Sequence, residues 1–291
     1  MTMKQTLIAL AAVVACATSI TAQAECLNDT QVAELAASYV AKTPAPNFPA
    51  LSEADGACTR AKLNAQLAPR LGKVIGYKAG LTNPAVQKRF NTDKPVWGKL
   101  YEGMVLASGA TVDAAFGARP LYEADMLVRV KSAAINHART PLEVLQHIDQ
   151  VIPFIELPDL MVQAPSQLNG AGVAAINVGA RLGVAGKPIA VPTTRGEQYA
   201  LLDALERMSV TLTDGQGYKL GGGTGSDILG QPLMAVVWLT GALQKEDITL
   251  QPGDLVSLGS FSALLPPRAG LAVTAKFDGL PGAQPVRVTF K

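Results

Sequence analysis

Residues 121–130 read LYEADMLVRV, an apolar run that carries two acids, Glu123 and Asp125. The run has the length and composition of a β-strand, and residues two apart on a strand point to the same face. Both carboxylates would therefore leave a largely apolar segment in the same direction. Like charges at that spacing raise each other's pKa and destabilise the fold unless a cation lies between them. The stretch thus predicts a strand that holds a charged site.

A second apolar run repeats this anomaly. Residues 152–157 read IPFIEL and carry one acid, Glu156. Two strands that each bury an acid suggest a shared partner. Three carboxylates without a histidine favour a hard divalent cation, first Mg²⁺, with Mn²⁺ or Ca²⁺ as alternatives. The other interpretation is that each acid meets a basic side chain, such as Arg119, Arg129 or Arg181.

Polar groups also lie at the ends of two other expected strands. Lys78 follows the apolar run 74–77 and precedes a glycine turn, where a lysine can reach a site as a proton donor or carboxylate binder. A solvated turn lysine is the alternative. Gly259 and Ser260 follow the run 255–258 and could hold a carboxylate or carbonyl oxygen, although ordinary turns use the same residues.

The remaining pattern predicts a helical start followed by a body rich in strands. We expect helices over residues 29–42, 59–71, 140–151, 197–208 and 233–243. We expect strands over residues 74–78, 121–130, 174–178, 255–258, 271–277 and 286–290. The glycine-rich residues 220–225 lack the spacing of a nucleotide-binding loop and are interpreted as a flexible turn.

The composition excludes several classes of protein. The 291 residues are 48% hydrophobic and 16% charged, whereas a typical soluble domain has about 25% charged residues. Such apolar content excludes a disordered or fibrous chain. The net charge of +2 gives no support for a nucleic-acid partner. The histidines, His137 and His147, are too few to favour a Ser-His-Asp triad or a histidine-rich metal site.

The N-terminus has the pattern of a secretory signal peptide. Lys4 precedes an apolar segment at residues 7–17, and Ala22-Gln23-Ala24 matches a small-x-small cleavage site. We therefore expect residues 1–24 to be removed and the mature protein to be periplasmic or secreted, with no other membrane segment. An uncleaved anchor and a lipoprotein signal at Cys16 are the alternatives.

Removal of this peptide leaves two cysteines, Cys26 and Cys58. In an oxidising compartment they predict a disulfide, which would contribute about 3–4 kcal/mol if unstrained. Two free buried thiols are the alternative. The domain division that we expect is a helical N-terminal region at residues 25–71 and a strand-rich body at residues 72–291.

Several motifs together resemble one family. They are residues 76–82 (GYKAGLT), 123–125 (EAD), 154–157 (FIEL), 253–256 (GDLV) and 259–260 (GS). In this order they resemble the 2-keto-4-pentenoate hydratase branch of the fumarylacetoacetate hydrolase superfamily, over roughly residues 60–291. The resemblance implies an α+β fold, in which a small helical N-terminal region lies on a mixed β-roll or barrel. It makes residues 72–291 a metal-dependent catalytic β-roll domain, and it implies a homo-oligomer.

The resemblance also implies roles for individual residues. It assigns Mg²⁺ or Mn²⁺ to Glu123, Asp125 and Glu156, and it makes Lys78 both catalytic and substrate-binding. Asn177, Gly259 and Ser260 are then further substrate-binding positions.

The implied reaction adds water to a 2-hydroxydienoate through a metal-stabilised enolate and gives a 4-hydroxy-2-oxo acid. Three alternatives remain open. The chain could be a C–C hydrolase or a 2-oxo acid decarboxylase of the same superfamily, or an exported binder of small carboxylates without activity.

Overall fold

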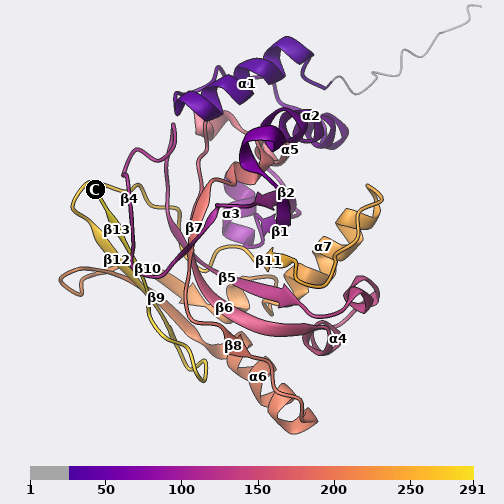
Figure 1. Cartoon of the computed structure of the whole chain (residues 1–291), viewed down its shortest axis with the longest axis vertical. Helices are drawn as coiled ribbons and strands as arrows, with labels where there is room; N and C mark the ends of the chain where they lie inside the picture. Colours follow the sequence, from indigo (N-terminus) through magenta and orange to yellow (C-terminus); the bar gives the residue numbers. More distant parts are fainter. Residues whose placement is uncertain (1–25) are drawn as a thin grey trace, which may run out of the picture.

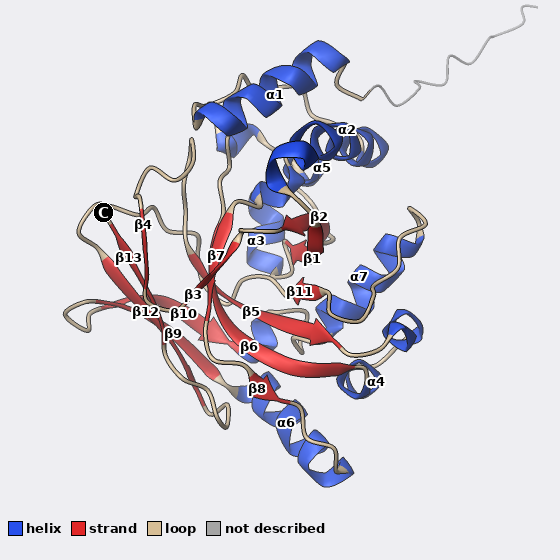
Figure 2. Ribbon diagram, in the orientation of Figure 1, coloured by secondary structure: helices blue, strands red, loops and turns tan. Residues whose placement is uncertain are grey.

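Two β-sheets form the body of the molecule, and the helices lie around their edges and outer faces (Figures 1 and 2). The structure is a computed structural model that describes residues 26–291. The predicted signal peptide, residues 1–24, lies outside the described residues.

The helices fall into an N-terminal group and a group distributed through the body. The α-helices are α1 (Asp29–Ala41), α2 (Glu53–Leu71), α3 (Pro84–Arg89), α4 (Pro141–Gln146), α5 (Gly170–Ala175), α6 (Arg195–Arg207) and α7 (Met234–Gln244). Short 3₁₀ turns are η1 (Ala133–His137), η2 (Pro165–Gln167), η3 (Asn177–Gly179) and η4 (Gly225–Asp227). Helices α1, α2 and α5 pack together at one end of the molecule (Figure 1).

The larger sheet has the order β2-β1-β11-β5-β6-β7-β3, and β8 pairs with β6 at one end. Its strands are β1 (Val74–Gly80), β2 (Val96–Tyr101), β3 (Val105–Ala107), β5 (Glu123–Val130), β6 (Ile148–Leu157), β7 (Leu182–Ala185), β8 (Ile189–Ala190) and β11 (Leu255–Ser257). The sheet is mixed, because β1–β11 and β3–β7 are parallel and the other pairs are antiparallel.

The smaller sheet has the order β10-β9-β12-β13-β4. Its strands are β4 (Ala110–Val112), β9 (Ser209–Asp214), β10 (Lys219–Thr224), β12 (Ala272–Asp278) and β13 (Val286–Phe290). Fully buried residues of both sheets, such as Met126 of β5 and Val288 of β13, belong to one apolar core. The curled pair of sheets with few helices confirms the α+β class that the sequence predicts.

Strand β5 shows how this core positions the acids. Ala124, Met126 and Val128 point into the core between the sheets. Glu123 and Asp125 alternate with them and therefore lie on the opposite face of the sheet. The acids are buried there too, and neighbouring segments contact them on that face: Lys78 of β1 donates to Glu156, and the Gly259 amide after β11 donates to Asp125.

The helix boundaries follow from capping residues. Helix α1 starts after Asn28, whose side chain accepts from the Gln31 amide, near the predicted start at residue 29. Helix α2 starts at Glu53, six residues before the predicted start at 59, because Ser52 and Asp55 form a capping box. Ser-x-x-Asp at residues 52–55 was the signal that could have predicted this start.

Three predictions of secondary structure were wrong. The helix predicted over 140–151 ends at Gln146, and Ile148 already begins β6 because its apolar residues pair with β5. The strand predicted over 174–178 is helix α5 followed by η3, since Asn169 caps a run of small residues that packs on α2. Residues 220–225, interpreted as a turn, lie mostly in strand β10, which pairs with β9.

The expected boundary between residues 71 and 72 coincides with an element boundary. Helix α2 ends at Leu71 and strand β1 begins at Val74. The division into two domains stays a prediction. Among the helices of residues 26–291, none combines the length and the apolar character that a membrane crossing requires.

Candidate metal-dependent active site

Four neighbouring strands place acids and a lysine on one face of the larger sheet. Lys78 of β1 pairs with Ser257 of β11, which in turn pairs with Leu127 of β5. Glu123 of β5 pairs with Glu156 of β6. Residues that pair across strands share a face, as do residues two apart along a strand. Asp125, two residues from both Glu123 and Leu127, therefore lies on this face as well.

We call Glu123, Asp125 and Glu156 the acid cluster. Their exposed fractions are 8%, 0% and 3%, and Lys78 is 2% exposed. With all four groups ionised, three negative charges face one positive charge in a buried site. Buried charges are stable when they are paired, so the site has an excess of negative charge that the surrounding residues leave unmatched.

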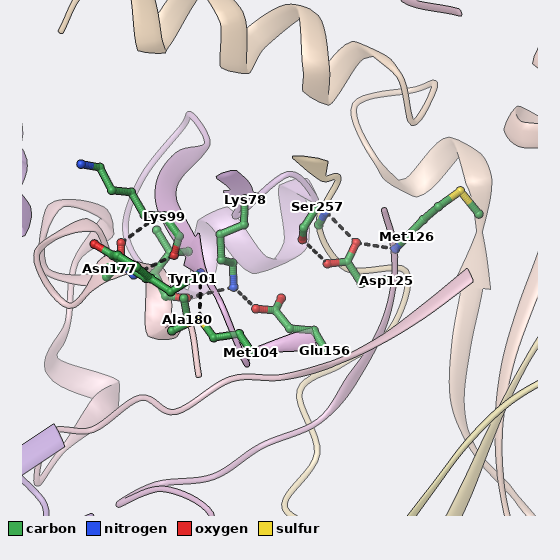
Figure 3. Close-up of polar contacts among 12 residues, drawn as sticks. Lys78, Lys99, Tyr101, Met104, Asp125, Met126, Glu156, Asn177, Ala180 and Ser257 are labelled. Carbon is green, nitrogen blue, oxygen red and sulfur yellow. Dashed lines mark hydrogen bonds and ion pairs between the residues drawn. The ribbon is translucent and has the colours of Figure 1, made fainter. Parts of the chain in front are cut away.

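The single buried ammonium holds one member of the acid cluster. The Lys78 Nζ donates to Glu156 Oε1 and to the carbonyl of Val178, 3.0 Å away (Figure 3). The other interpretation of the sequence was that each acid pairs with an arginine. In the described part of the chain those arginines are engaged elsewhere: Arg129 with Asp149, Arg181 with Asp159, and Arg119 with the carbonyls of Val162 and Gln163.

Strand β11 and the turn after it hold Asp125. Its Oδ2 accepts from the Ser257 hydroxyl at 2.5 Å, and its Oδ1 accepts from the amides of Met126 at 2.5 Å and Gly259 at 2.9 Å (Figure 3). Gly259 thus contributes to the site through its backbone N–H, on an acid. Ser257 was not among the predicted site residues, although a lone hydroxyl inside the apolar run 255–258 was a signal for it.

Burial and repulsion raise the pKa of two of these acids. Burial raises the pKa of Glu123 well above its usual value, and the negative charge of Glu156 raises it further. Burial raises the pKa of Asp125 to about 8, again with a contribution from Glu156, whereas the Ser257 hydrogen bond opposes this rise. Without a further cation, the site therefore favours protons on these carboxyl groups.

The donor set suits a hard divalent cation, which would replace those protons. Carboxylate oxygens are the ligands that Mg²⁺ and Mn²⁺ prefer, and the excess negative charge equals the charge of one such ion. Within residues 26–291, the side chains of His, Cys, Asp and Glu do not gather into a preassembled group of three ligands. Glu156 turns toward Lys78, and Asp125 turns toward Ser257 (Figure 3).

The Asn177 side chain faces away from the acids and holds the backbone beside Lys78. Its Oδ1 accepts from the Lys99 amide at 2.8 Å and from Asn64 Nδ2 at 3.1 Å, and its Nδ2 donates to the Lys99 carbonyl at 3.0 Å. Asn177 and Val178 both have φ of 55°. Asparagine tolerates this conformation, but it is strained for the β-branched Val178. These contacts fix the Val178 carbonyl that Lys78 meets, which is a positioning role, and the substrate-binding role of Asn177 stays a prediction.

A pocket opens next to the acid cluster. Its polar lining includes Lys78, Glu123, Thr82 and Ser260, and Gly259 lies at the same wall. The Ser260 hydroxyl donates to the Ser262 carbonyl. The rest of the lining is mostly apolar: Leu81, Val86, Phe90, Pro158, Leu160, Val173, Val178 and Leu264. The pocket therefore has a charged end at the cluster and an apolar end beyond it.

No family model matches the chain. A 2-keto-4-pentenoate hydratase of Burkholderia vietnamiensis is 27% identical over 219 residues, which cover 75% of this chain and 78% of the relative. The chain is therefore similar to 2-keto-4-pentenoate hydratases over about three quarters of its length. The resemblance that the sequence motifs suggested is thereby confirmed.

Solved structures support the fold. A 4-oxalocrotonate decarboxylase from Pseudomonas putida G7, complexed with magnesium and adipate, is similar with a TM-score of 0.77 and 22% identity, over 91% of this chain and 99% of that chain. A fumarylpyruvate hydrolase from Pseudomonas aeruginosa, in complex with Mn²⁺ and pyruvate, has a TM-score of 0.52 and 16% identity, over 74% of this chain and 89% of that chain. The expected superfamily fold is confirmed.

Proposed function

We propose that the chain is a metal-dependent hydratase, a lyase that adds water to a 2-hydroxydienoate of the 2-keto-4-pentenoate type. The observation that carries the proposal is the acid cluster, which lies with Lys78 on one face of the sheet at the charged end of a pocket. The hydratase named above as a relative supports the same reaction.

In this proposal, Glu123, Asp125 and Glu156 hold Mg²⁺ or Mn²⁺. Magnesium and Mn²⁺, named for the two similar structures, support this choice. When bound, the cation supplies Lewis-acid stabilisation of the negative charge that develops on the keto oxygen of a 2-oxo acid. The Ser257 hydroxyl and the Gly259 amide orient the Asp125 carboxylate.

The reaction then needs protons at two carbon atoms. One proton moves from the 2-hydroxyl group of the dienoate to C5, which gives an unsaturated 2-oxo acid. Water adds next, with its hydroxyl on C4 and a proton on C3, and the product is a 4-hydroxy-2-oxo acid. Lys78 is the buried cation that lines the pocket, and we assign proton transfer to its Nζ. The Ser260 hydroxyl, in the same wall, orients the substrate.

The apolar end of the pocket favours the hydratase over the alternatives that act on dicarboxylates. Adipate, named for the decarboxylase structure, has a carboxylate at each end. In this chain the far end of a substrate meets Phe90, Leu160 and Val173, and Lys78 is the one cationic side chain among the described residues that line the pocket. A second carboxylate there would lose its hydration without a partner. A short apolar tail fits better.

The proposal is tested by following the dienol absorbance of 2-hydroxypenta-2,4-dienoate with the purified mature protein. The protein is first freed of metal with a chelator and then supplied with Mg²⁺ or Mn²⁺. We expect the absorbance to disappear only with metal, and NMR to identify the 4-hydroxy-2-oxo acid. Release of CO₂ or of a cleaved fragment would instead support the decarboxylase or the C–C hydrolase. Tight binding without turnover would support a binder.

We also propose that the protein is exported. Residues 1–24 have the signal-peptide pattern, and cleavage after Ala24 would leave Glu25 as the first residue. N-terminal sequencing of the protein from the periplasm or medium is expected to begin at Glu25. A cytoplasmic protein that begins at Met1 would refute export, and a lipid-modified Cys16 would support the lipoprotein alternative.

A disulfide between Cys26 and Cys58 belongs to the same proposal. The two residues lie with Cα atoms 5.6 Å apart, within the range that a disulfide spans. The bridge would tie the start of the mature chain to helix α2, and Leu27, next to it, donates its amide to Thr59. We expect a mass lower by two hydrogen atoms before reduction, and a loss of about 3 kcal/mol of stability on reduction.

The homo-oligomer implied by the resemblance is a separate proposal. Light scattering of the purified protein at several concentrations would measure its assembly state. A monomer at all concentrations would contradict the implication without affecting the proposed reaction.

A further inference from the structure

The hydroxyl of Thr82 is buried at the charged end of the pocket with no hydrogen-bond partner. Thr82 is 1% exposed, and its Oγ1 is one of three buried side-chain polar atoms without a partner among the described residues. Buried hydroxyls almost always find a partner, because an unmade hydrogen bond destabilises the fold. Thr82 also lines the pocket beside Lys78 and Glu123. Its free hydroxyl therefore points to a ligand.

The backbone around Thr82 is held in a strained conformation. Leu81, the preceding residue, has φ of 55°, which is rare for a residue other than glycine. Gln87 Nε2 donates to the Leu81 carbonyl at 2.8 Å, and the Leu229 amide donates to the Thr82 carbonyl at 3.2 Å. These contacts from two other segments fix the turn. Strain that the surrounding structure maintains in this way is common at ligand sites.

The position of Thr82 indicates which part of a ligand it meets. A side chain at Gly259 would collide with Thr82 Oγ1, so the two residues are in close contact. The Gly259 amide donates to Asp125 of the acid cluster. Thr82 thus lies beside the cluster, where the keto and carboxylate oxygens of a 2-oxo acid would bind, and not beside the apolar tail. A neutral hydroxyl can donate to a carboxylate there without adding charge.

We propose that Thr82 donates a hydrogen bond to the carboxylate of the substrate. This inference rests on the proposed function, since it names a group that recognises the same 2-oxo acid. It adds a binding residue to the reaction that the sequence motifs did not assign. A hydrogen bond to a charged group in a buried site corresponds to roughly a 10-fold to 100-fold difference in affinity.

The test compares Thr82→Val, which replaces the hydroxyl by a methyl group of similar shape, with Thr82→Ser, which keeps it. In the Mg²⁺-loaded protein we expect Thr82→Val to raise the KM for the dienoate and the Kd for pyruvate, measured by calorimetry, by about 10-fold to 100-fold. Its kcat should change less than about threefold. We expect Thr82→Ser to stay close to the wild type in all three quantities.

A second readout needs no activity. Because the hydroxyl is unpartnered, Thr82→Val should leave the melting temperature of the ligand-free, metal-free protein unchanged or raise it. A lower melting temperature would show a structural role and overturn the proposal, as would an unchanged KM or a loss confined to kcat. A wild-type protein that neither hydrates the dienoate nor binds pyruvate would overturn the proposed function as well. Wild-type turnover with an unaffected Thr82→Val would overturn the role of Thr82 alone.

Discussion

Asp159 and the acid cluster are both buried, yet the surrounding residues balance the negative charge of Asp159 and not that of the cluster. Asp159 is 1% exposed, and its carboxylate accepts from the amides of Ala118 at 3.0 Å and Arg119 at 2.7 Å, with Arg181 at 3.8 Å. One negative charge there meets two N–H donors and a guanidinium. In the acid cluster, three carboxylates share Lys78.

The difference separates a structural acid from a functional one. A carboxylate whose hydrogen bonds and charge are satisfied by its own chain stabilises the fold and needs nothing else. A group of carboxylates with excess negative charge raises the free energy of the metal-free protein. Binding of a cation removes this repulsion, and the relief contributes to the affinity for the cation. Four measurements test this difference between Asp159 and the acid cluster.

The largest effect is expected for the double variant Glu123→Gln and Asp125→Asn. It removes two of the three anionic ligands, so we expect the bound divalent metal to be lost and turnover of the dienoate to fall at least about 10³-fold. Elemental analysis after dialysis and the absorbance assay measure the two effects. Asp149→Asn, which removes a partly exposed acid at the other end of β6, is the matched control and should keep metal and activity. Unchanged metal content and turnover in the double variant would remove the metal site.

The next effect is expected at Asp159, on stability rather than on activity. Asp159→Asn would turn its NH₂ group toward the N–H group of either Ala118 or Arg119, and it would leave Arg181 without its anion. We expect a loss of about 3 kcal/mol in the free energy of unfolding. Denaturant unfolding measures this loss, and turnover per folded molecule should change little. A stable but inactive variant would mean that Asp159 belongs to the site.

These contrasts show how far the sequence could predict the site. Alternation along residues 121–130 placed Glu123 and Asp125 on one face, because strand periodicity is local. The Glu123–Glu156 pairing and the contact of Lys78 with Glu156 depend on the register of distant strands, which no local pattern specifies. Physical reasoning from the residues suggested that the three acids share a cation, and the motif resemblance assigned each acid as a metal ligand and joined Lys78 to them.

The helix–strand errors have the same origin. Residues 174–178 and the end of 140–151 contain apolar residues that suit either element, and partners far away in the sequence decided between them. The roles of Ser257 and Thr82 also depend on tertiary contacts. A single hydroxyl in an apolar run marks a position as unusual. Only the residues around it in the folded chain show whether it hydrogen-bonds to an acid, as Ser257 does, or is left for a ligand, as we propose for Thr82.

The third prediction concerns metal removal and pH. The pKa of Asp125 is raised to about 8 in the metal-free fold, whereas in the unfolded chain it lies near its usual value of about 3.9. Between these values the native state holds a proton that the unfolded state has released. The stability of the metal-free protein should therefore fall as pH rises from about 4 to 8, by up to roughly 1.4 kcal/mol per pH unit.

Saturating Mg²⁺ should flatten this slope, because the cation binds the ionised carboxylates of the native state. Unfolding by denaturant at several pH values, with and without Mg²⁺, measures both slopes. Asp159→Asn should keep the Mg²⁺ dependence, and the Glu123→Gln, Asp125→Asn double variant should lose it. A metal-free protein that becomes more stable between pH 5 and 8 would contradict the charge excess in the acid cluster.

The smallest effect is expected for a partly exposed pair on the same two strands. Arg129 of β5 donates to both oxygens of Asp149 of β6, at 2.9 and 2.7 Å, and this hydrogen bonding lowers the pKa of Asp149. A lowered pKa has the opposite sign to that of Asp125. The pair contributes stability above pH 4, and that contribution is lost as pH falls through the pKa of Asp149 in the folded protein.

Water screens the pair, so we expect it to contribute about 0.5 kcal/mol to the free energy of unfolding, measured as the coupling between Asp149→Asn and Arg129→Met at pH 7. The coupling should vanish at pH 2 and shrink in 1 M salt. A coupling above about 2 kcal/mol would mean that contact with water does not weaken this ion pair relative to the buried charges.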